Sequence, residues 1–89
     1  MSLHALERLL FELNRGIVTP DQLRSDAQSL FAGRDLSPDE QRWMTDGDVL
    51  ALYRHGVHPL LLAPASRIFG LDAQQLREAL APALGERKL

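Results

Sequence analysis

Helix start and stop signals recur along this 89-residue chain at short intervals. Thr19-Pro20, Ser37-Pro38 and His58-Pro59 each place a capping residue before a proline, an order typical of a helix N-terminus. Glycines then follow several of the apolar segments, where a residue in the left-handed conformation ends a helix. No segment alternates apolar and polar residues as a half-buried strand does. The sequence therefore predicts an all-α protein, a single compact domain of five or six short helices.

Apolar residues spaced three and four apart mark the face that each expected helix buries. Leu3, Leu6, Leu9, Leu10 and Leu13 form the longest of these stripes. Pro64 falls inside the fifth expected helix and should kink or divide it, because proline removes one backbone hydrogen bond. The expected helices run from Ser2 to Gly16, Pro20 to Gly33, Ser37 to Asp46, Asp48 to Gly56, Pro59 to Phe69, and Asp72 to about Pro82, with a frayed tail over residues 85–89.

Composition restricts the kinds of partner this chain can have. Hydrophobic residues make up 45% and charged residues 25%, which favours a folded domain spanning residues 1–89 over disorder. The formal charge of −2 gives no basic footprint for nucleic acid. The longest apolar run, residues 57–65, is far shorter than the roughly 20 residues of a membrane span, and the N-terminus does not resemble a signal peptide. We therefore expect a cytoplasmic protein without nucleic-acid or membrane partners.

The two histidines of His55-Gly56-Val57-His58 are the first candidates for a metal site. Gly56 is expected to end a helix between them, and no third ligand has an obvious place, whereas a structural zinc ion takes four ligands. The pattern instead predicts that His58 caps the helix beginning at Pro59 and that His55 lies in the last turn of the preceding helix. No metal site is predicted.

Acidic residues and one serine were the remaining candidates for chemistry. Asp39, Glu40, Asp46 and Asp48 are grouped as in a calcium loop, but such a loop needs oxygen ligands at about six regular positions, which apolar residues interrupt here. Helix capping explains these side chains better. Ser66 has no partnered base and is expected to be a packing residue. The sequence thus predicts no catalytic residue and no cofactor bound by this chain.

Three consecutive leucines, Leu60, Leu61 and Leu62, open the fifth expected helix. Successive helical residues point about 100° apart, so the three cannot share one buried stripe. Either at least one of them is exposed or meets a partner, or the helix is central and surrounded by the others. Tyr53 and Arg67 are residue types that anchor interfaces.

The central segment carries motifs that resemble a known family. Leu36-Ser37-Pro38-Asp39-Glu40, Asp48-Val49-Leu50-Ala51-Leu52-Tyr53, Gly56-Val57-His58-Pro59-Leu60-Leu61 and Phe69-Gly70 are similar to the LigA-type domain, the small α subunit of extradiol protocatechuate 4,5-dioxygenase. The resemblance covers residues 8–72 and is strongest over 36–70. The family's Asp, Gly and His-Pro correspond to Asp48, Gly56 and His58-Pro59. By the physics of caps and turns, the fold-defining residues are Ser37, Asp48, Gly56, Pro59 and Gly70.

The resemblance implies a division of labour between two chains. In that family the Fe(II) ion, its two histidines and carboxylate, and the catalytic base belong to a large LigB-type subunit, over whose active-site mouth the α subunit packs. This chain is then a non-catalytic accessory subunit, although it is shorter than a typical α subunit. The alternatives are a stand-alone recognition or leader-like domain that presents residues 83–89, and a homodimer paired through its leucines. The residues expected to meet a partner are Tyr53, His55, His58, Leu60, Leu61 and Arg67.

Overall fold

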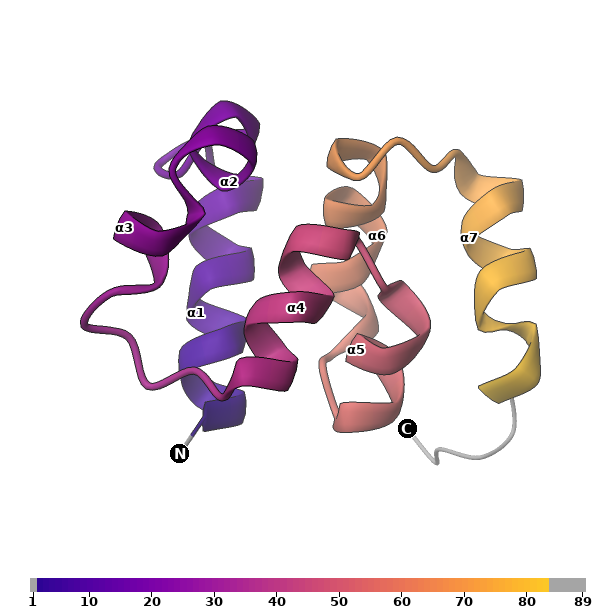
Figure 1. Ribbon diagram of the computed structural model, residues 1–89. Coiled ribbons are helices and arrows are strands. Elements are labelled where there is room, and N and C mark those ends of the chain that lie inside the picture. Colours follow the sequence, from indigo (N-terminus) through magenta and orange to yellow (C-terminus); the bar gives the residue numbers. More distant parts are fainter. Residues whose placement is uncertain (1, 84–89) are drawn as a thin grey trace.

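The computed structural model describes residues 2–83 and confirms the all-α fold class, with no strand among them (Figure 1). Seven α-helices and a final 3₁₀ turn make up the described chain. They are α1 (Ser2–Asn14), α2 (Pro20–Ser25), α3 (Ala27–Phe31), α4 (Pro38–Asp46), α5 (Val49–His55), α6 (Pro59–Ile68), α7 (Ala73–Leu80) and η1 (Ala81–Ala83).

The leucine stripe of α1 lies at the centre of the core. Leu6, Leu9 and Leu10 are fully buried, together with Met44 of α4 and Leu52 of α5. Burying side chains of this kind stabilises the fold by about 1.5–3 kcal/mol each. The apolar periodicity of the sequence therefore identifies the core face of α1 correctly.

Helices α1 and α6 pack side by side and run in the same direction (Figure 1). Two hydrogen bonds join them. The backbone N–H of His58 donates to Glu7 Oε2 at 3.1 Å, and Asn14 Nδ2 donates to the carbonyl of Leu61 at 3.0 Å. Because Glu7 lies in the middle of α1 and Asn14 is its last residue, these bonds fix the start of α6 against the C-terminal half of α1.

The N-terminal caps lie where the sequence predicts them. Ser37 Oγ accepts from the backbone N–H of Glu40 at 3.2 Å, and the Glu40 carboxylate accepts from the Ser37 N–H at 2.8 Å, which completes a capping box before α4. Asp48 Oδ1 accepts from the amide three residues further on, at the start of α5. His58 Nδ1 accepts from the amide two residues further on, with Pro59 as the first residue of α6.

Two glycines lie at the ends of α5 and α6. Gly56 caps α5 with a φ of +119°, a conformation that residues with a Cβ rarely adopt. Gly70, with a φ of +92°, follows the last residues of α6. The chain can therefore reverse direction sharply between α5 and α6, which brings His55 and His58 close to the same end of the molecule.

The predicted helix over residues 20–33 is two helices, so the described chain has seven α-helices and not five or six. Asp26, with φ −139° and ψ 37°, separates α2 from α3. Serine and aspartate disfavour helix interiors, because their side chains bond to nearby backbone groups, and Ser25 Oγ donates here to the carbonyl of Asp21.

The predicted division of α6 at Pro64 does not occur. The helix continues from Pro59 to Ile68 with Pro64 in its interior, although the carbonyl of Leu60 loses its usual donor four residues on. Pro82 lies in η1, directly after α7. The expected fraying of residues 85–89 lies outside the described part of the chain.

Candidate partner-binding face

The three consecutive leucines of α6 lie in three different environments. Leu62 is buried, with 1% of its surface exposed, and Leu61 is half-buried against the core. Leu60 is 78% exposed in the first turn of the helix. The central, fully surrounded helix is therefore not the arrangement found, and Leu60 is the leucine that the fold leaves available.

Tyr53 does not lie on the surface, and its predicted place in the interface stays a prediction. It is 5% exposed on the buried face of α5. Val49, Leu52 and Tyr53 have the one-, three- and four-residue spacing of a single helical face, and α5 packs against both α6 and α7. His58, the N-cap of α6, and Arg67, in its last turn, are both exposed.

A second exposed apolar residue, Phe11, lies on α1 at the level of Leu60. Phe11 is 48% exposed and lies one turn from both Glu7 and Asn14, the residues that bond α1 to α6. The hydrogen bonds from α1 reach His58 and Leu61, and Leu60 lies between these two residues in the sequence. Phe11 and Leu60 are thus held at the same height on adjacent helices, and we call the exposed surface that carries them the α1–α6 face.

His55 belongs to a separate cluster that joins α4 to α5. Its Nε2 lies 2.8 Å from Glu40 Oε2, and its ring meets that of Trp43 edge to face, with centroids 5.0 Å apart. Glu40 has no exposed surface, and its other carboxylate oxygen accepts from the Ser37 N–H. One buried carboxylate therefore both completes a helix cap and orients an imidazole.

The imidazole of His55 faces a surface depression of about 420 Å³. A carboxylate-oriented histidine is a common general base, but it needs a nucleophile within hydrogen-bond reach. The depression offers none, since no serine, threonine or cysteine lines it; its lining residues are Trp43, Asp48, Leu50, Ala51, Arg54 and His55. The cluster thus orders the α4–α5 contact and does not assemble a nucleophilic site from the described residues.

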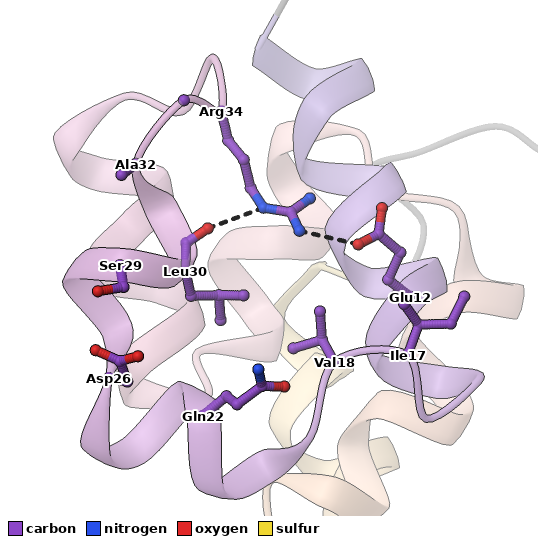
Figure 2. A pocket seen from close by; sticks show the side chains of 10 residues that line it. Glu12, Ile17, Val18, Gln22, Asp26, Ser29, Leu30, Ala32 and Arg34 are labelled. Atoms are coloured by element: carbon purple, nitrogen blue, oxygen red, sulfur yellow. Dashed lines mark hydrogen bonds and ion pairs between the residues drawn. The ribbon is translucent and has the colours of Figure 1, made fainter.

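A larger depression, of about 480 Å³, lies between α1 and the α2–α3 segment (Figure 2). Arg34 crosses it, donating from Nη2 to Glu12 Oε1 at 2.9 Å and from Nε to the carbonyl of Leu30 at 2.9 Å. This bond from Arg34 holds the pKa of the Glu12 carboxyl below its usual range, although partial burial acts in the opposite direction. The pair neutralises the charge of both side chains and fastens the segment after α3 to α1.

The two histidine candidates have separate hydrogen-bond partners in the fold. His58 Nδ1 caps α6 and His55 Nε2 pairs with Glu40. Within residues 2–83 no group of three or more histidine, cysteine, aspartate or glutamate side chains is arranged to hold a metal. Ser66 is buried and donates to the carbonyl of Ala63 at 2.7 Å, as a packing residue does.

Sequence reasoning missed Phe11 and the burial of Glu40. Phe11 does not belong to the leucine stripe of α1. Its position outside the buried face is the sequence signal that could have predicted its exposure. Glu40 was recognised only as a capping residue, because its contact with His55 joins positions 15 residues apart.

No helix within residues 2–83 is long and apolar enough to span a bilayer.

Comparisons of the chain with protein-family models, with curated proteins and with solved structures find no match. The LigA-type resemblance of residues 36–70 therefore stays a prediction from the sequence.

Proposed function

We propose that this chain is a non-catalytic helical domain that binds a partner protein through the α1–α6 face. The observation that carries the proposal is the 78% exposure of Leu60, in a domain whose other α6 leucines are half-buried or buried, on a helix packed against the one that carries the exposed Phe11. Covering a leucine side chain of this kind contributes about 1.5–3 kcal/mol. Two such side chains at one height supply the apolar centre of a small interface.

The most concrete form of this function is that of an accessory α-type subunit of an Fe(II) extradiol aromatic-ring-opening dioxygenase. Its support is the resemblance of residues 36–70 to the LigA-type domain. In this form the iron and its ligands belong to a LigB-type catalytic chain, this chain binds no cofactor, and the pair works in the cytoplasm. In this form His58 and Leu61, which flank Leu60 in the first turn of α6, and Arg67, two turns further on, lie at the edge of the contact.

The test is affinity capture from the native host with the full chain and two matched variants. Leu60→Asp removes the apolar anchor and introduces a charge, and we expect it to abolish partner capture while its circular dichroism stays that of the wild type. Ile17→Asp is the control, since Ile17 is 65% exposed but lines the depression between α1 and α3. Equal capture by wild type and Leu60→Asp would refute the proposed face.

The identity of the captured chain decides between the remaining forms of the function. A larger protein carrying a two-histidine, one-carboxylate iron site supports the dioxygenase form, and ring-opening activity on catechols can then be measured. A peptide-modifying enzyme supports the leader-like alternative, in which an altered intact mass of the natural protein is expected. Light scattering that gives a concentration-dependent dimer, lost in Leu60→Asp, supports self-association through the same leucine.

A further inference from the structure

We infer that the α1–α6 face takes an acidic amphipathic segment of the partner protein, with apolar side chains on Phe11 and Leu60 and carboxylates on the surrounding arginines. This inference rests on the proposed function and adds the chemistry of the partner. It depends on how charge is distributed around α1 and α6.

Among the side chains of α1 whose exposure the structure describes, residues 3–14, the exposed ones are basic or aromatic. His4, Arg8, Phe11 and Arg15 are all exposed, and their spacing of four, three and four residues places them within about 60° of one another around the helix. Arg15 follows α1 directly, and its N–H still donates to the carbonyl of Phe11 at 3.0 Å. Its guanidinium lies 5.6 Å from the centroid of the Phe11 ring, so the cation and the apolar anchor form one surface.

Both acidic residues of α1 make hydrogen bonds within the fold. Glu7 accepts from the backbone of His58 on α6, and Glu12 accepts from Arg34 on the opposite side. The Glu12 side chain is only 14% exposed, whereas that of Arg8, with which it also pairs, is 72% exposed. The sequence of α6 contains no acidic residue, and the exposed Arg67 lies in its last turn, seven positions after Leu60.

In a chain with a net charge of −2, the exposed charged side chains of this face are therefore arginines, while the partly exposed Glu7 carboxylate is bonded to the His58 N–H. Opposite charges at the rim of an interface steer a partner and fix its orientation, while apolar side chains at the centre supply affinity. Three arginines are too few for nucleic acid, whose binding proteins make 6–10 phosphate contacts. On an anionic membrane they would contribute only about 1 kcal/mol each. An acidic protein segment with apolar anchors fits this face best.

The experiment selects ligands without assuming a partner. The full chain is immobilised, and a displayed library of random 12-residue peptides is enriched on it. We expect the enriched peptides to carry net negative charge with apolar residues at helical spacing. Their affinity, measured by fluorescence anisotropy, should fall about tenfold in Arg15→Glu and Phe11→Ala and should fall further as salt is raised.

The control variant is Arg42→Glu, because the Arg42 side chain is 62% exposed and lies on α4. It should bind the acidic peptides as the wild type does, and peptides with their carboxylates changed to lysines should regain affinity for Arg15→Glu. The enriched peptides could instead carry no negative charge and still compete with the partner protein whose capture depends on Leu60. That result would overturn this inference and leave the proposed function intact. Peptides whose binding ignores Phe11 and Arg15, or binding only to vesicles of anionic phospholipid, would overturn it too.

Discussion

Replacing Glu40 with alanine removes two hydrogen bonds at one buried position. Its carboxylate accepts from the Ser37 N–H at 2.8 Å and lies 2.8 Å from His55 Nε2. A hydrogen bond to a charged group contributes about 1.5–3 kcal/mol. The His55 side chain is 32% exposed, so its share is reduced by solvent. We expect Glu40→Ala to lower the free energy of unfolding by about 3–4 kcal/mol, a large part of the 5–15 kcal/mol typical of a domain.

Urea denaturation followed by circular dichroism and by the fluorescence of Trp43, the one tryptophan of the chain, measures this loss. Glu40→Gln keeps an oxygen for the Ser37 N–H and should lose only about 1–2 kcal/mol. The control is Asp39→Ala, because Asp39 precedes Glu40 in the first turn of α4 but its side chain is 63% exposed. If Glu40→Ala and Asp39→Ala cost the same, or if a double-mutant cycle finds no coupling between Glu40 and His55, the reasoning is refuted.

Two further predictions concern charge and backbone conformation. Because Arg34 lowers the pKa of Glu12, the stabilisation from their pair is complete above the unfolded pKa and is lost as pH falls through the folded one. Urea unfolding from pH 7 to about 2.5 should therefore show a flatter acid limb in Glu12→Gln than in the wild type, and identical limbs would contradict this. Gly47→Ala should cost about 2–4 kcal/mol, since Gly47 has a φ of +67° and an added Cβ would lie 3.0 Å from Cβ of Phe69. Gly33→Ala, with a φ of +78° and no atom within 4 Å of the added Cβ, should cost about 1–2 kcal/mol. Thermal melts of the two variants measure these losses, and an equal loss in both would rule out the packing contribution.

Features that depend on neighbouring residues could be predicted from the sequence. The capping box at Ser37, the cap at Asp48 and the turn at Gly56 each follow from a few residues and their local hydrogen bonds. Helical geometry also excludes a shared buried stripe for residues 60–62, because the three side chains diverge by about 100° per residue, but it leaves open whether one of them is exposed or the helix is surrounded. These features account for the all-α class and for the order of most helices.

Features that depend on distant residues could not be predicted in this way. Tyr53 is buried because α6 and α7 cover α5 from both sides, an arrangement that no local pattern specifies. Glu40 is buried because it meets His55 across a turn. The break at Asp26 was missed for a different reason, since Leu23 and Phe31 allow a single amphipathic helix and only the local preferences of Ser25 and Asp26 oppose it.

The segment Gly56–Leu61, which carries much of the LigA-type resemblance, separates into two parts in the structure. Gly56, His58 and Pro59 turn the chain, cap α6 and begin it, so their presence is explained by the fold without any partner. Leu60 has no such use, because its side chain is exposed at the first turn of α6 while the caps around it would form equally well with a polar residue there. The resemblance at Gly56, His58 and Pro59 therefore predicts an arrangement of helices. A partner interaction shared with the LigA-type family would instead depend on Leu60. The comparison of Leu60→Asp with Ile17→Asp tests that interaction. Both side chains are exposed, so we expect neither substitution to change the stability of the fold appreciably.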